Sequence, residues 1–129
     1  MGGCGPTFVL LHGLAIGSLT WTSVASFLSQ AGHRVLANDQ RGHGLSERTV
    51  RGFGFDGMCA DLEGLLRERD VRDPILVGQS WGGSVVMGYA LATRARRGDS
   101  VSCMGASWIF MTSQGPLGNR LGGNCVRLT

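Results

Sequence analysis

The sequence predicts an α/β fold in which helices cover both faces of a parallel sheet of about four strands. Short apolar runs recur along the chain, helix-like segments separate them, and turn-forming residues follow each run. Strands that alternate with helices need crossover connections, which give parallel sheets with both faces covered. The 129 residues, 43% of them hydrophobic, are enough for one domain with its own core.

The expected strands are the apolar runs at residues 7–11 (TFVLL), 35–37 (VLA) and 75–77 (ILV). Continuous apolar runs of this length are typical of strands buried on both faces. Residues 101–106 predict a fourth strand. From about residue 113 the pattern is lost, so we expect a core at residues 1–112 and an irregular or disordered tail at 113–129.

Three helices are expected between and after these strands. The first has apolar residues at helical spacing over residues 21–28, with Ser18 or Thr20 as its N-cap. The second presents one apolar face over residues 55–66, and the third runs from about residue 80 to 97.

The segment Gly78-Gln79-Ser80-Trp81-Gly82 lies where the third strand gives way to the third helix. A Gly-x-Ser-x-Gly motif in this context forms a nucleophile elbow, a sharp turn that exposes the serine at the start of the helix. Glycines on either side let the backbone pass close by. The alternative is that Ser80 is an ordinary helix N-cap.

Polar side chains also follow the first two strands. His12 comes directly after the first strand and Asp39 after the second. In parallel sheets, ligands bind at the carboxyl ends of the strands. We therefore expect His12, Asp39 and Ser80 to share one edge of the sheet.

Three motifs in order resemble the core of the α/β-hydrolase family. They are Leu10-Leu11-His12-Gly13-Leu14, Asp39-Gln40-Arg41-Gly42-His43-Gly44-Leu45-Ser46, and Gly78-Gln79-Ser80-Trp81-Gly82-Gly83. The resemblance covers about residues 5 to 112. It implies a serine hydrolase, esterase-like, that acts on an ester or related acyl substrate.

The resemblance also implies site roles. Ser80 would be the nucleophile, and the backbone N–H groups of Leu14 and Trp81 would form the oxyanion hole. The other motif residues would support this geometry: His12, Gly13, Gly78, Gln79, Gly82, Asp39 and Arg41. We expect His12 to hold its loop by hydrogen bonds, with service by His12 or His43 as the base an alternative.

The sequence supplies no acid and no base for a catalytic triad with Ser80. The family order is Ser, then Asp or Glu, then His, but no histidine follows Ser80, and Asp99 falls at the wrong end of the expected fourth strand. Relatives also run to about twice this length. We therefore expect an incomplete core, inactive or weakly active by itself, with a non-catalytic remnant or ligand-binding pseudo-hydrolase as the alternative.

Other reactions of the family use the same elbow, so the motif does not identify the substrate. Peptidase, carbon–carbon bond hydrolase and cofactor-free perhydrolase activities are alternatives. Haloalkane dehalogenase and epoxide hydrolase chemistry is disfavoured, because those relatives place Asp where this chain has Ser80.

Composition limits the partners. The twelve basic residues are scattered arginines, and the net charge is only +3, so we expect no nucleic-acid partner. Four separated cysteines form no C-x-x-C pair and no cluster with histidine, so we expect no metal site. We also expect no cofactor. No apolar stretch reaches the length of a membrane span, and we expect a cytoplasmic protein. The expected partners are a small ester-like molecule and, through exposed sheet edges, other copies of the chain.

Overall fold

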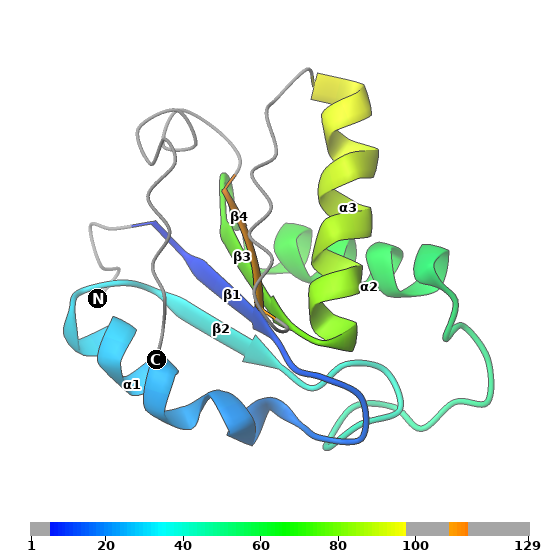
Figure 1. The fold of residues 1–129 in the computed structure, drawn as a ribbon, viewed down its shortest axis with the longest axis horizontal. Helices are drawn as coiled ribbons and strands as arrows, with labels where there is room; N and C mark the ends of the chain where they lie inside the picture. Colours follow the sequence, from blue (N-terminus) through cyan, green and yellow to red (C-terminus); the bar gives the residue numbers. More distant parts are fainter. Residues whose placement is uncertain (1–5, 98–108, 114–129) are drawn as a thin grey trace.

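The structure, a computed structural model, describes residues 6–97 and 109–113 (Figure 1). The elements in chain order are β1 (Phe8–Leu11), the 3₁₀ helix η1 (Ser18–Trp21), α1 (Thr22–Gln30), β2 (Val35–Asn38), α2 (Phe55–Glu68), β3 (Ile75–Gln79), α3 (Trp81–Arg97) and β4 (Ile109–Ser113). The first three expected strands and all three expected helices are present.

The sheet has the strand order β2-β1-β3-β4. Strand β1 pairs in parallel with β2 on one side and with β3 on the other, so Leu11 lies beside Asn38 and Gly78. The carboxyl ends of these three strands therefore meet at one edge, as the α/β prediction requires.

The fourth strand differs from the expectation. Strand β4 pairs antiparallel with β3, with Ile109 opposite Gln79 and Ser113 opposite Ile75. The strand predicted at residues 101–106 lies outside the described residues, as does the tail beyond residue 113. Apolar runs indicate strands but carry no information on direction, which depends on where the preceding connection emerges.

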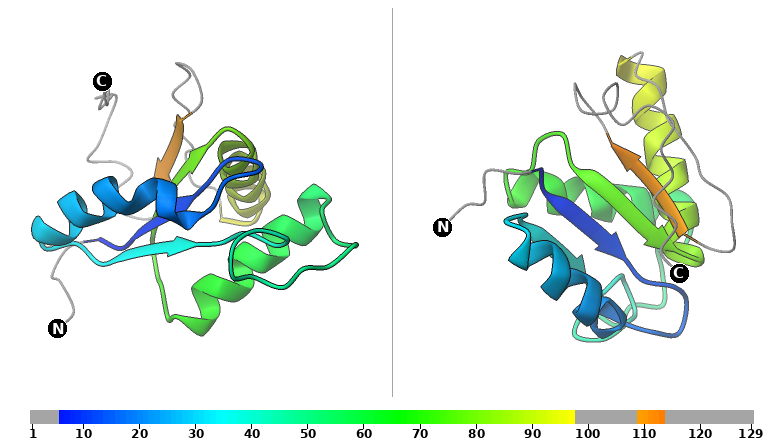
Figure 2. Two further views of the ribbon diagram at one scale, coloured as in Figure 1. Left: turned by 90° about the horizontal axis from the view of Figure 1, so that it is seen from below. Right: turned by 60° about the vertical axis from the view of Figure 1, so that its left-hand side comes forward.

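Helices cover both faces of the sheet (Figures 1 and 2). On one face, α1 and Trp21 pack over Leu10, Ile75 and Val77. On the other, α2 and α3 pack over Val9, Leu11 and Leu76. Successive strand residues point to opposite faces, so each apolar run contributes to both cores.

The expected cap at Ser18 or Thr20 is wrong. Residues Ser18–Trp21 form a 3₁₀ turn ahead of α1, and no side chain caps either helix locally. The backbone N–H of Ser18 instead donates to Asp39 Oδ1 at 2.7 Å. A carboxylate from a distant turn thus accepts a hydrogen bond from a backbone N–H at the helix start, in place of a local N-cap side chain.

Candidate functional site

Ser80 occupies the single residue between β3 and α3. Its φ of 51° lies in the left-handed region, which residues other than glycine rarely adopt. The side chain is exposed, and the Ser80 carbonyl accepts the first helical hydrogen bond, from Ser84 N–H at 3.1 Å. The residue is therefore neither inside a regular helix nor in the extended conformation typical of an N-cap.

The glycines flanking Ser80 are required by close backbone packing. A Cβ on Gly78 would lie 2.3 Å from the carbonyl oxygen of Gly82, and a Cβ on Gly82 would lie 2.4 Å from that of Leu11. Both contacts are with backbone atoms, which cannot rotate away. The pattern Gly-x-Ser-x-Gly thus has a steric origin in this turn.

The loop after β1 lies against Ser80. A Cβ on Gly13 would lie 3.3 Å from Ser80 Cβ and 3.5 Å from the carbonyl oxygen of Gln79. Gly13 is followed by Leu14, and Trp81 opens α3, where the first N–H groups of a helix lack partners within the helix. The structure thus brings the sequence motifs around His12 and Ser80 together.

His12 is fully buried behind this loop. Its Nε2 accepts the backbone N–H of Gln40 at 2.9 Å, and its Nδ1 lies 2.7 Å from the carbonyl oxygen of Gly13. An amide N–H only donates and a carbonyl only accepts, so the ring carries its proton on Nδ1. With both nitrogens engaged, His12 holds the loop and is not positioned as a base.

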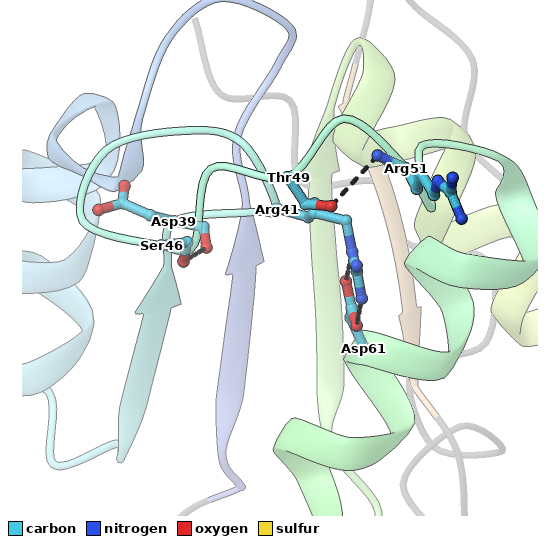
Figure 3. Close-up of polar contacts among 6 residues, drawn as sticks. All are labelled: Asp39, Arg41, Ser46, Thr49, Arg51 and Asp61. Atoms are coloured by element: carbon cyan, nitrogen blue, oxygen red, sulfur yellow. Dashed lines mark hydrogen bonds and ion pairs between the residues drawn. The ribbon is translucent and has the colours of Figure 1, made fainter.

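Asp39 joins the loop after β1 to the turn after β2. Its carboxylate accepts the backbone N–H groups of Ser18 at 2.7 Å and Leu45 at 3.0 Å. These bonds, that of Leu45 first, lower the pKa of Asp39 below its ordinary value of 3.8, because they stabilise the ionised form. The Ser46 hydroxyl donates to the Asp39 carbonyl and closes the turn (Figure 3).

Arg41 forms a bidentate ion pair with Asp61 of α2 (Figure 3). Arg41 Nε lies 2.7 Å from Asp61 Oδ2, and its terminal nitrogen lies 2.6 Å from Oδ1. The hydrogen bond and the charge of Asp61 raise the pKa of Arg41. The pair ties the turn to α2. Asp61 is not among the site residues predicted from the sequence, although its position beside Leu62 and Leu65 puts it at the border of the apolar face of α2.

A cavity of about 700 Å³ lies between the turn after β2 and α2. Its lining includes Asn38, Arg41, Asp61 and Arg67, but neither Ser80 nor Trp81. It is therefore distinct from the surroundings of the serine.

Some predicted features fall outside the described residues, namely Asp99 and the segment 104–108. Within residues 6–97 and 109–113, no group of three His, Cys, Asp or Glu side chains is arranged to hold a metal ion. The helices of that same part include none long and apolar enough to cross a bilayer.

Comparison with known proteins agrees with the geometry. The family model described as alpha/beta hydrolase fold matches residues 6–115. A non-heme haloperoxidase of Rhodococcus erythropolis is 36% identical over 104 residues, which are 81% of this chain and 38% of that protein. Epoxide hydrolase A of Mycobacterium tuberculosis is 36% identical over 83 residues, 63% of this chain and 26% of that protein.

Solved structures give the same result. An esterase from Exiguobacterium antarcticum superposes with a TM-score of 0.66 at 27% identity, covering 69% of this chain and 33% of that one. A bromoperoxidase from Bacillus anthracis gives 0.65 at 36% identity, covering 67% and 32%. The chain spans about a third of the length of these relatives. With its sheet, its strand-to-helix serine turn and these matches, the chain belongs to the alpha/beta hydrolase fold family.

Proposed function

We propose that this chain carries the nucleophile and the oxyanion hole of an acyl-transfer site that acts on a small ester-like molecule. The observation that supports the proposal best is the backbone of Ser80, whose φ of 51° holds an exposed side chain at the start of α3. A strained angle at one exposed serine calls for a functional explanation.

The chemistry follows from the surroundings of Ser80. The hydroxyl oxygen attacks the carbonyl carbon of the ester, and the carbonyl oxygen takes on negative charge. In the proposed site the N–H groups of Leu14 and Trp81 stabilise that charge, and losing one such donor costs on the order of 3 kcal/mol in the transition state. The bond between the carbonyl carbon and the leaving oxygen then breaks, and that oxygen departs as the alcohol with the proton that the serine hydroxyl gave up. Water attacks the acyl-serine next, which releases the acid and returns a proton to the serine oxygen.

The base for this reaction is not supplied by the histidines of the chain. These are His12, His33 and His43. His12 has both ring nitrogens engaged, and so does His43, which accepts Ala15 N–H and contacts the Arg41 carbonyl. His33 precedes β2, at the opposite end of the sheet from Ser80. We therefore expect the chain by itself to react slowly.

A second candidate is perhydrolysis, which the haloperoxidase names of several relatives favour. Hydrogen peroxide would then attack the acyl-serine in place of water. The acyl group would be transferred to the peroxide oxygen and released as a peroxy acid, and the serine hydroxyl would be restored. Epoxide opening is not proposed, because the resemblance predicts Asp for that chemistry and position 80 is Ser.

Labelling with a fluorophosphonate probe tests the proposal. We expect stoichiometric modification of the folded chain, detected by intact mass, and none of Ser80→Ala. Ser84→Ala, in the first turn of the same helix, is the matched control and should label like the unchanged chain. Folded protein that resists labelling would instead favour a non-catalytic remnant. Assaying p-nitrophenyl esters with and without hydrogen peroxide, with peroxy acid as the readout, separates hydrolysis from perhydrolysis.

A further inference from the structure

His43 reaches out of its own turn to the loop beside Ser80. Its Nε2 accepts the backbone N–H of Ala15 at 3.1 Å, across 28 residues of sequence. Its Nδ1 lies 3.0 Å from the carbonyl oxygen of Arg41. The amide can only donate and the carbonyl can only accept, so His43 is neutral and protonated on Nδ1.

The rings of His12 and His43 also touch each other. Their centroids are 4.9 Å apart at an interplanar angle of 63°, an edge-to-face contact. Both rings have the same tautomer, and each links the loop after β1 to the segment after β2. Together the two side chains hold residues 13–15 of the loop after β1 by hydrogen bonds.

The bonds of this pair fall on the two peptide planes that flank Leu14. The first plane contains the Gly13 carbonyl, which His12 holds at 2.7 Å, and the N–H of Leu14. The second contains the N–H of Ala15, which His43 holds. A trans peptide is planar, with its C=O and N–H in opposite directions, so fixing the Gly13 oxygen also aims the Leu14 N–H.

The loop needs these bonds because packing does little to hold it. Leu14 is 66% exposed, and Ala15 is exposed as well. Ala15 has a φ of 61°, a conformation that alanine rarely adopts and that persists only where surrounding contacts enforce it. The bond to His43 is such a contact.

We propose that His43 is a positioning residue for the oxyanion hole and that, with His12, it sets the direction of the Leu14 N–H. The inference rests on the proposed function of Ser80 and Leu14. His43 does not touch the reacting atoms. Its effect is to keep one donor preorganised, which matters because a preorganised donor stabilises the developing charge without a cost of reorientation during the reaction.

The test compares three variants. His43→Phe keeps a flat ring against His12 but removes the acceptor for Ala15 N–H. His43→Gln restores an acceptor at similar reach and serves as the rescue. His33→Phe, at the far end of β2, is the matched control. The readouts are the rate of fluorophosphonate labelling at Ser80, the melting temperature and the hydrogen exchange of the Leu14 and Ala15 amides.

We expect His43→Phe to label about tenfold more slowly, a part of the loss that follows complete removal of one donor, and its Ala15 amide to exchange at least tenfold faster. His43→Gln should recover most of the labelling rate, and His33→Phe should match the unchanged chain. Labelling of folded His43→Phe at the unchanged rate would overturn the inference, and so would unaltered exchange at Ala15.

Failure of the proposed function gives a different result. In that case the unchanged chain would label no faster than Ser80→Ala. The catalytic part of the inference would then fall with the proposed function, while hydrogen exchange would still report whether His43 holds the loop.

Discussion

Two residues with left-handed backbone adjoin, in sequence, the two residues of the proposed oxyanion hole. They are Ser80 and Ala15, with φ of 51° and 61°. In the described ranges, the other non-glycine residues with positive φ are Asp70 and Asp73, in the turn between α2 and β3. Aspartate tolerates this conformation comparatively well, whereas serine and alanine are disfavoured there. Backbone strain that lacks a local sequence explanation thus occurs at the site.

Asp39 is predicted to make the free energy of unfolding depend on pH in the acid range. Its pKa is lowered in the folded state by N–H donors from Leu45 and Ser18, so the ionised carboxylate stabilises the fold above the ordinary value of 3.8. That stability is lost as the pH falls through the lower folded value. We expect Asp39→Asn to be less stable than the unchanged chain at neutral pH, with the gap narrowing as the pH falls below 3.8. Urea unfolding over this range measures the effect, and parallel curves for the two proteins would refute it.

The ion pair of Arg41 and Asp61 is predicted to contribute more to the free energy of unfolding than the ion pair of Arg72 and Asp70. Its side chains are 29% and 40% exposed and meet at two points, whereas those of Arg72 and Asp70 are 86% and 83% exposed and 3.4 Å apart. A lysine cannot reproduce the two-pronged contact. We expect Arg41→Lys to lower the free energy of unfolding measurably and Arg72→Lys to leave it nearly unchanged. Chemical denaturation of both variants distinguishes them, and equal losses would contradict the assignment.

At the scale of elements, the packing of α3 onto β1 depends on Gly82. A methyl group there would lie 2.4 Å from the Leu11 carbonyl oxygen and 2.5 Å from that of His12. The helix start would have to move away from the sheet, and overpacking of this kind costs about 1–3 kcal/mol or more. We expect Gly82→Ala to lose stability and also to slow labelling of Ser80.

A glycine within a helix provides the control. Gly64 lies in the interior of α2, and a Cβ there would meet nothing within 4 Å. Replacing it with alanine removes a helix-destabilising residue without a clash. We expect Gly64→Ala to gain about 0.5–1 kcal/mol. Thermal and urea unfolding of both alanine variants give the comparison, and a Gly82→Ala protein as stable as the unchanged chain would show that the contact is not restrictive.

At the scale of the whole molecule, β2 is the outermost strand on one side of the sheet among the residues that the structure describes. The strand Val35–Asn38 carries no charged residue, and Ala37 is exposed. Further apolar side chains are exposed in the loops after β1 and β2, in η1 and at the start of α2: Leu14, Ile16, Leu19, Leu45, Val50, Phe53 and Phe55. An uncharged edge beside exposed apolar surface favours association.

We propose that copies of the chain self-associate through β2. The apparent mass from light scattering should rise with concentration in the micromolar to millimolar range. Ala37→Lys places a charge on the edge strand and should shift the protein toward monomer. Ser23→Lys adds the same charge on the exposed surface of α1 and should leave association unchanged. A chain that stays monomeric over this range, or equal effects of the two lysines, would exclude the β2 edge as the interface.

The amino-acid sequence by itself determined the alternation of strands and helices, the common edge for His12, Asp39 and Ser80, and the turn at Ser80. Each of these depends on local signals: apolar runs, helical spacing, and glycines placed where a side chain would clash. Such signals act over a few residues and are independent of how distant segments meet.

Only the tertiary structure decided the antiparallel direction of β4, the capping of Ser18 by Asp39, the pairing of Arg41 with Asp61, and the engagement of both nitrogens in His12 and His43. The contacts of Asp39 and Arg41 and the Nε2 contacts of the two histidines join partners 20 to 28 residues apart, whereas the two Nδ1 atoms contact carbonyl groups within two residues in sequence. Whether they meet depends on how the loops pack across the carboxyl edge of the sheet, and no local pattern of residues encodes that distance.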